Sequence, residues 1–357
     1  MMGGIQVKIY PFEDRTALQG LWVRLQQHSQ SPFLQWPWIN QWLKHCAYRV
    51  YVVEAVMVGQ PEQRVGIGLI SEHDNTLGVQ RTGNKRRDQI WPEHNDFLMV
   101  EDNRTQIRQQ MLTAVLEAFP AHYRLLWGAA NAELQPSVTE GYVKRVVWQA
   151  PSYVTDFSKW QSDNLESALS KSARSQIRRS HKKYAELGEI MLTRAESGEQ
   201  ITRYFDAMAT LHKQRWGEDS GFHNQVFRRF HYDLLQQDAN KGAAKRFTAL
   251  YRITAGEHDL GYLYVLLAGE GMAFYLSAFD YTLANSQRKP GLLAHAMLIQ
   301  RAYDHGLSHY DFLAGEARYK HTFTNHVEPM AIIEYRRNTP KVRTYALLRQ
   351  LKSYLGM

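Results

Sequence analysis

The order of turns, helices and strands between residues 288 and 320 constrains the fold of this chain most. Arg288-Lys289-Pro290-Gly291 forms a tight turn that opens a helical pattern running to about His305. Residues 309–313 then resemble a short strand, Gly315 breaks it, and a helix with acidic, phenolic and cationic side chains is expected over 316–323. This order of turn, helix, strand, glycine turn and helix predicts an α/β unit.

The length predicts two domains, because a chain of 357 residues exceeds the size at which single hydrophobic cores usually stop growing. We place them at residues 1–155 and 156–357.

A single cysteine, Cys46, excludes an internal disulfide, and no histidine spacing fits a metal site, so no metal is expected. The N-terminus lacks the pattern of a signal peptide, and the most apolar run, 50–58, is too short to span a bilayer. We therefore expect a cytoplasmic protein.

Both halves show the same predicted order of strand, helices, antiparallel strands, helix and strand. In the second half a long helix is expected over 164–187, and three antiparallel strands over 247–279 precede the turn at Pro290. A closing helix is expected over 341–354. The pattern predicts an α/β fold with mixed, mostly antiparallel sheets flanked by helices.

Positive charge is concentrated at one place in the chain. The net charge is +8, and residues 171–183 hold six lysine and arginine residues and no acidic residue. Arg174, Arg178 and Lys182 recur at helical spacing, which costs about a few tenths of a kcal/mol per like-charged pair. An anionic partner such as a substrate diphosphate, a tRNA or a lipid headgroup would offset that cost. The alternative is a solvated helix face near acidic residues of the other half.

An aromatic segment near the N-terminus has two interpretations. Trp36, Trp38 and Trp42 invite a carbohydrate site, since sugars stack on tryptophan, but Trp38 and Trp42 stand at i,i+4 spacing. Helical spacing favours core packing between helix and sheet. Elsewhere the sequence contains neither a Walker A loop nor a G-x-S-x-G motif, which argues against a nucleotide hydrolase and a serine hydrolase.

Five segments, in order, carry a family resemblance. They are the aromatic segment from Phe33 to Trp42, the basic helix closed by Leu187-Gly188, residues 211–216, Pro290-Gly291-Leu292-Leu293, and residues 315–320. Together they resemble the GNAT-like acyltransferases of the CelD, or cellulose-biosynthesis, type. These are relatives of the Fem-type transferases that add amino acids to peptidoglycan precursors. The resemblance implies two tandem GNAT-like domains, the second catalytic, with acyl-CoA as co-substrate.

The resemblance also implies roles for single residues. Asp311 would act as base, directly or through water; Tyr319 would return a proton to the thiolate; and Lys320 would stabilise the oxyanion or bind the acceptor. Arg288 and the amides of Gly291 and Leu292 would hold the donor pyrophosphate at a helix N-terminus. Three further residues are candidates for substrate binding: Tyr275, Arg178 and Glu316. For Glu316 we favour the blander role of pairing with the helix dipole.

The pyrophosphate loop departs from the family pattern, because Leu293 stands where a small residue is usual. The expected reaction is acyl transfer from acyl-CoA to an amine, for example on an envelope sugar or polysaccharide precursor. Two alternatives stay open: aminoacyl transfer from tRNA, as in the Fem-type relatives, and a non-catalytic scaffold with a degenerate GNAT core. No DNA partner and no transmembrane segment are expected.

Overall fold

One sheet runs through both halves of the molecule. A computed structural model describes residues 4–119, 124–137, 140–161, 163–242 and 245–340, together with 342 and 344; the predicted helix over 341–354 falls almost entirely outside them. In this described part the sheet order is β1-β2-β3-β4-β6-β13-β7-β12-β11-β10-β9-β8, with β5 beside β3. The strands are β1 (Ile5–Pro11), β2 (Arg49–Met57), β3 (Gln60–His73), β4 (Thr76–Val79), β5 (Leu98–Met99), β6 (Arg124–Asn131), β7 (Tyr142–Asp156), β8 (Ile190–Arg194), β9 (Thr248–Ala255), β10 (His258–Ala268), β11 (Gly271–Phe279), β12 (His309–Ala314) and β13 (His326–Arg337).

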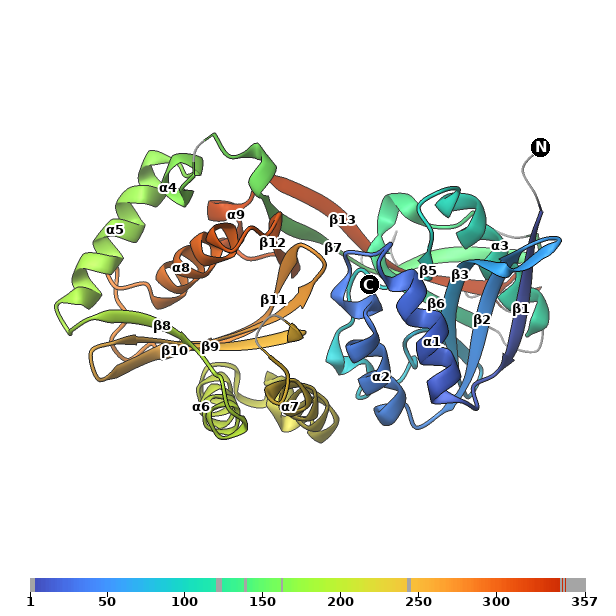
Figure 1. Cartoon of the computed structure of the whole chain (residues 1–357), viewed down its shortest axis with the longest axis horizontal. Coiled ribbons are helices and arrows are strands. Elements are labelled where there is room, and N and C mark those ends of the chain that lie inside the picture. The colour runs from blue at the N-terminus through green and yellow to red at the C-terminus, as the bar shows by residue number, and fades with distance from the viewer. Residues whose placement is uncertain are drawn as a thin grey trace.

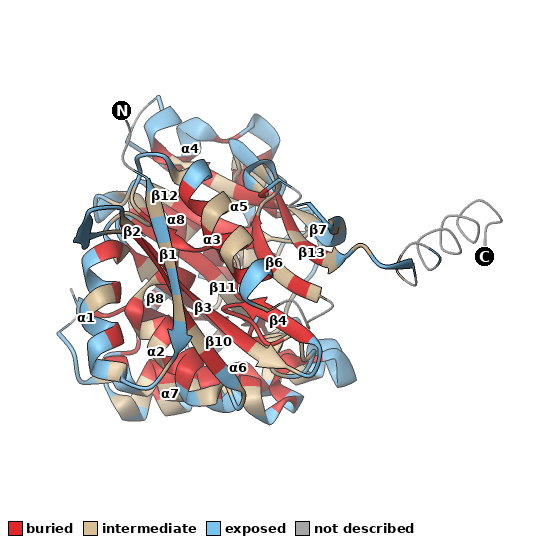
Figure 2. Cartoon of the chain, turned by 90° about the vertical axis from the view of Figure 1, so that its right-hand side faces the viewer, coloured by how far each residue is buried: buried red, intermediate tan, exposed pale blue. Residues whose placement is uncertain are grey.

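Helices cover both faces of this sheet (Figure 1). They are α1 (Arg15–Gln26), α2 (Trp36–His45), α3 (Arg104–Ala118), α4 (Leu165–Ala168), α5 (Lys171–Ala185), α6 (Gly198–Trp216), α7 (Gln225–Ala239), α8 (Pro290–Asp304) and α9 (Lys320–Phe323). Helices α1, α2, α6 and α7 share one hydrophobic core that joins the two halves. On the other face, α8 and α3 each close a separate core. Figure 2 shows the buried residues on the sheet and on the inner sides of the helices.

The two halves exchange their last strands. Strand β7, at the end of the first half, pairs antiparallel with β12 of the second. Strand β13, at the end of the second half, pairs antiparallel with β6 of the first half and with β7. The boundary at residue 155 that we predict therefore separates chain segments whose strands interleave at the centre of the sheet.

Two predicted helices are shorter than expected. The helix predicted over 164–187 is split into α4 and α5, because the extended residue Leu169 buries its side chain and the Ser170 hydroxyl then caps α5 by accepting from the amide of Ala173. The helix predicted over 316–323 is only the single turn α9. Glu316 therefore lies outside it.

The tryptophan segment is core. Trp38 and Trp42 are 1% and 3% exposed on α2, and the Trp38 ring packs edge-on against Phe33 and Phe230, each at 4.8 Å between ring centres. Phe230 belongs to α7, so this packing links the halves. The prediction of core packing is confirmed.

Candidate active site

A wedge opens in the sheet where two parallel strands diverge. Strands β11 and β12 pair only from Gly271 opposite His309 to Ala273 opposite Asp311. On its other side, β12 shifts register against β7 between Asp311 and Ala314. Leu313 has a φ of 58°, a left-handed conformation that costs a non-glycine residue about 1–3 kcal/mol. The backbone is thus held in an irregular path directly after Asp311.

Two of the predicted catalytic residues meet at this point. Asp311 accepts a hydrogen bond from the amide of Leu313 (2.7 Å), and the ammonium of Lys320 donates to the carbonyls of Leu313 and Ala314, each at 3.0 Å. Lys320 is 5% exposed. Burial lowers the pKa of Lys320, while nearby carboxylates oppose that shift. A buried ammonium beside the wedge is a ready source of positive charge.

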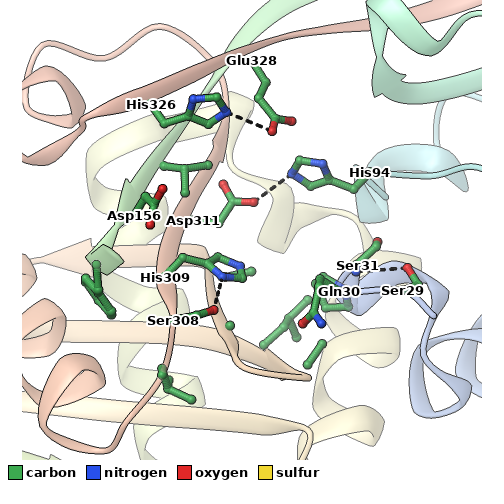
Figure 3. Close-up of a pocket in the computed structure, with 18 of the residues that line it drawn as sticks. Ser29, Gln30, Ser31, His94, Asp156, Ser308, His309, Asp311, His326 and Glu328 are labelled. Atoms are coloured by element: carbon green, nitrogen blue, oxygen red, sulfur yellow. Dashed lines mark hydrogen bonds and ion pairs between the residues drawn. The ribbon is translucent and has the colours of Figure 1, made fainter. Parts of the chain in front are cut away.

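The first half supplies two titratable residues that sequence reasoning missed. His94 has a φ of 44°, and its Nε2 lies 2.8 Å from a carboxylate oxygen of Asp311 (Figure 3). The neighbouring Glu93 accepts a hydrogen bond from the amide of Ala314 at 2.5 Å. In the sequence both residues belong to a polar loop over 82–96. The charged residues of this loop were the only sign in the sequence that it could belong to a site. Its contact with Asp311, more than 200 positions away, arises only from the tertiary fold.

These neighbours shift one another's pKa values. Burial alone would lower the pKa of His94, but the carboxylate of Asp311 outweighs it and raises that pKa to about 9. For Asp311, burial raises the pKa, and the stronger effect of His94 and the Leu313 amide leaves it below its ordinary value. Burial raises the pKa of Glu93 to about 7. Near neutral pH the site therefore holds an ionised pair and a carboxyl group close to its midpoint.

A cleft of about 880 Å³ lies between the halves and reaches Asp311 and His94. It is lined by the loop after α1, the start of α3 and the ends of β7, β10 and β12, and its side chains are mainly polar (Figure 3). On the cleft wall His326 pairs with Glu328 at 3.2 Å. The polar lining residues include His28, Ser29, Gln30, Ser31, Glu101, Arg104, Asp156, Ser158, Ser308 and His309. A polar compound of moderate size fits this space.

Tyr319 packs on the α8 side of β12. Its ring stacks on His295 of α8, with 5.1 Å between ring centres and 17° between planes, and it also contacts Phe312. Burial raises the pKa of the Tyr319 phenol above its usual value. The pKa of His295 falls to about 3, first through burial and then through Lys320. A protonated phenol is thus present on this side at any physiological pH.

The predicted pyrophosphate turn is at the N-terminus of α8. Lys289 is the N-cap without a side-chain cap, and Pro290 occupies the first turn together with Gly291 and Leu292, whose amides have no intrahelical acceptor. The Arg288 guanidinium donates to the carbonyl of Lys183 (3.2 Å). Leu293 is 1% exposed within the core on this face.

The three predicted substrate-binding residues occupy different places. Tyr275 donates to the carbonyl of Ile90 (2.5 Å), so it anchors the loop that carries Glu93. Glu316 accepts from the Tyr153 hydroxyl (3.0 Å) rather than from helix amides, so the helix-dipole role expected for it is wrong. Arg178 lies on α5 and pairs with Glu166 (3.0 Å from Nε). Tyr275 thus lies on β11, one of the two strands of the wedge, and Arg178 lies on α5, which Figure 1 shows at the outer side of the molecule.

The first half has a corresponding parallel strand pair with different side chains beside it. Strands β4 and β6 are parallel over three residue pairs, as β11 and β12 are. Beside them the Asp96 carboxylate accepts from the Trp127 indole (2.9 Å) and from Arg108 (2.7 Å), and Arg108 is 2% exposed. Helix α3 begins at Arg104 after Asn103, without a Pro-Gly turn. In the described part of the first half, the helix that lies between these two strands along the chain thus begins differently from α8.

Residues 171–321 match the protein family described as "Acetyltransferase (GNAT) domain". This segment is a GNAT acyltransferase domain. It extends from α5 to α9 and contains the wedge, the α8 turn, Asp311, Tyr319 and Lys320. A GNAT domain implies an acyl-CoA co-substrate and an amine acceptor. Among curated protein sequences none matches this chain significantly.

Solved structures resemble the whole chain, not the GNAT domain alone. FemX has a TM-score of 0.59 at 11% identity and covers 94% of this chain and 99% of its own. A conserved protein of unknown function from Bacteroides thetaiotaomicron has a TM-score of 0.56 at 12% identity, covering 93% and 100%. The C-terminal domain of a protein described as a lysylphosphatidylglycerol synthetase, from Agrobacterium fabrum, has a TM-score of 0.56 at 9% identity, covering 95% and 98%. At these identities the likeness concerns the fold, and the predicted fold class of two GNAT-like units is confirmed.

Metal binding and membrane spanning depend, in the described residues, on the arrangement of their ligating side chains and on the length and polarity of their helices. Within that part of the chain no group of three or more histidine, cysteine, aspartate or glutamate side chains is arranged to hold a metal ion. None of its helices is both long enough and apolar enough to cross a bilayer.

The His94–Asp311 pair predicts a pH-dependent stability. A histidine pKa raised from 6.5 to about 9 stabilises the fold fully below pH 6.5, and this contribution is lost as the pH rises through 9. The lowered pKa of Asp311 adds stability that is lost as the pH falls below its ordinary value. We expect His94→Gln to reduce the free energy of unfolding by up to about 3 kcal/mol between pH 5 and 6.5, and by much less above pH 9. Urea unfolding across pH measures this, with the exposed His258→Gln as control; a pH-independent difference would contradict it.

Proposed function

We propose that the GNAT domain transfers an acyl group from acyl-CoA to an amine bound in the cleft between the halves. The main support is that the family match covers the segment in which the parallel strands β11 and β12 diverge. The buried ammonium of Lys320 lies at the same place. The family match lies wholly in the second half, so we assign catalysis to residues 156–357 and formation of the acceptor cleft to both halves.

The donor is assigned to the α8 side. The free amides of Gly291 and Leu292 suit a pyrophosphate, since a helix N-terminus carries positive potential and unpaired donors. Arg288 contacts the α5 carbonyl of Lys183 and pairs with Glu186 at 3.6 Å; a phosphate would be a stronger acceptor than that carbonyl. Leu293 is buried in the core on this face, so its size is compatible with this assignment.

The chemical step is attack of a neutral amine on the thioester carbon. Lys320 is assigned to the carbonyl oxygen, where negative charge develops as the carbon–nitrogen bond forms. The carbon–sulfur bond then breaks, and the thiolate is assigned its proton from Tyr319. Burial raises the pKa of that phenol, which keeps it protonated but also makes it a weaker acid. The N–H proton lost by the nitrogen passes to a base on the acceptor side of the cleft, which Asp311 and His94 border. No covalent enzyme intermediate is needed, and Cys46 has a pKa raised to about 11 by burial, which makes it a poor nucleophile.

The acceptor we propose is a polar amine, such as an amine on an envelope sugar or polysaccharide precursor. The cleft supports this class, because its lining is rich in hydroxyl, imidazole and carboxylate groups that can hydrogen-bond a polyol. The structure of the basic helix, residues 171–183, supports aminoacyl-tRNA as the donor less than its sequence does. Arg178 is paired with Glu166, Lys183 with Glu186, and Arg174 donates to the Leu169 carbonyl.

The assignment of the donor predicts a binding defect. Replacing Arg288 with alanine should weaken binding of acetyl-CoA about tenfold, because one charge-assisted contact to phosphate is worth about 1.5 kcal/mol or more. Isothermal titration calorimetry with acetyl-CoA measures the Kd, and Arg203→Ala, an exposed change on α6, is the matched control. Equal affinity of Arg288→Ala and wild type would contradict this site. If the protein bound tRNA in a salt-sensitive way and did not bind CoA, aminoacyl-tRNA would replace acyl-CoA as the proposed donor.

A further inference from the structure

The loop that carries Glu93 is anchored at the wedge by both strands that form it. The Tyr275 hydroxyl of β11 donates to the carbonyl of Ile90, and Glu93 itself accepts from the Ala314 amide at the end of β12. A carboxylate of the first half is thereby fixed beyond the last paired residues of β11 and β12, where the two strands diverge, and directly beside His94, which lines the cleft. Only one of its oxygens, Oε2, accepts from that amide; the other can take a proton.

From this placement we propose that Glu93 is the general base of the reaction and removes the proton of the attacking amine. The inference rests on the proposed function. As nitrogen attacks the thioester carbon, its N–H proton passes to the free carboxylate oxygen of Glu93, directly or through one water. The carbon–sulfur bond breaks, and the thiolate is protonated by Tyr319. In each turnover Glu93 gains one proton and Tyr319 loses one. Both groups then return to their starting state by exchanging protons with solvent.

The charged groups around Glu93 support this role. It faces His94 on its own loop, Asp311 on β12, Lys320 on α9 and Tyr275 on β11. Burial raises the pKa of Glu93 to about 7, although His94 and Lys320 oppose that shift. A general base is most effective when its pKa lies near the working pH. Asp311 is less suited, because its ion pair with His94 and its bond to the Leu313 amide lower its pKa and its basicity. His94 is held protonated by that same pair.

A structural role for Glu93 can be separated from a chemical one. Glutamine keeps a carbonyl oxygen that can accept from the Ala314 amide, but it cannot take a proton. If Glu93 only anchored β12, Glu93→Gln would leave turnover unchanged. If Glu93 is the base, we expect Glu93→Gln to lower kcat about 100-fold, with the Kd for acetyl-CoA unchanged.

The experiment follows thiol release from acetyl-CoA with glucosamine, ethanolamine and lysine as amine probes, from pH 5.5 to 9. For wild type we expect kcat/KM, calculated on the concentration of unprotonated amine, to rise tenfold per pH unit up to about pH 7, and for Glu93→Gln this acidic limb should disappear. Added formate should restore part of the turnover of Glu93→Ala, since it can occupy the space of the lost carboxylate. Glu62→Gln, an exposed carboxylate on β3 with 94% side-chain exposure, is the matched control.

The outcomes separate the two proposals. Wild-type protein that neither binds acetyl-CoA nor releases thiol would overturn the proposed function, and this inference with it. An active wild type whose rate and acidic limb survive Glu93→Gln would overturn the inference alone. Loss of the acidic limb in His94→Gln, with Glu93→Gln unaffected, would assign the base to His94.

Discussion

Replacing Lys320 with methionine should lower kcat about 100- to 1,000-fold while leaving the affinity for acetyl-CoA nearly unchanged. Methionine keeps most of the apolar length of the side chain but carries no charge and no donor. Two of the three ammonium protons of Lys320 are used on the carbonyls of Leu313 and Ala314, which fixes the direction in which the charge can act. Removing one pre-positioned donor from a developing oxyanion costs about that factor in other acyl-transfer enzymes.

Two measurements separate this effect from a loss of folding. The carbonyls of Leu313 and Ala314 left without a donor should reduce the free energy of unfolding by about 1–3 kcal/mol, and the variant should still fold. The kcat defect should therefore remain when the rate is normalised to the amount of folded protein. Lys8→Met, an exposed change on β1, controls for loss of a positive charge. A defect confined to KM would show that Lys320 binds the acceptor instead, and full activity would remove it from the mechanism.

The second half of the fold could be predicted from local sequence, and its charged site could not. Pro290-Gly291 and the apolar pattern after it predicted the helix now seen at Pro290–Asp304, and the strand expected over 309–313 is β12. Periodicity and turn residues are local signals, so they survive without tertiary information. They also placed Asp311 and Lys320 near one glycine turn.

What local signals missed depends on contacts distant in sequence. Glu93 and His94 belong to an irregular loop. The pairing of β7 with β12 and of β13 with β6, together with the core shared by both halves, brings that loop to Asp311. The helix expected over 164–187 failed for a different reason. Burial of Leu169 and the Ser170 cap outweigh a continuous helical propensity at that point. The basic helix suggested an anion site, but two of its cations, Arg178 and Lys183, pair with an acidic residue on α4 and with one at the end of the helix itself.

Replacing Trp38 with alanine should lower the free energy of unfolding by about 3–5 kcal/mol, the usual cost of removing a large buried aromatic side chain. Trp38 is 1% exposed and packs against Phe230 of α7 and, at 6.0 Å between ring centres, Tyr275 of β11. The cavity would lie in the core shared by both halves. Guanidinium chloride unfolding followed by fluorescence and circular dichroism measures the change, and Trp216→Ala, at 56% exposure, should cost less than about 1 kcal/mol.

The manner of unfolding matters as much as its midpoint. Because β7 and β13 are exchanged between the halves and α2 packs on α7, neither half can lose its core without exposing the other. We therefore expect Trp38→Ala to shift one cooperative transition, with both probes coincident. Two separate transitions, with only the first moved, would show that the halves are independent domains. Glu93 would then reach the GNAT domain across an interface able to open on its own, and activity should be lost at denaturant concentrations below the main transition.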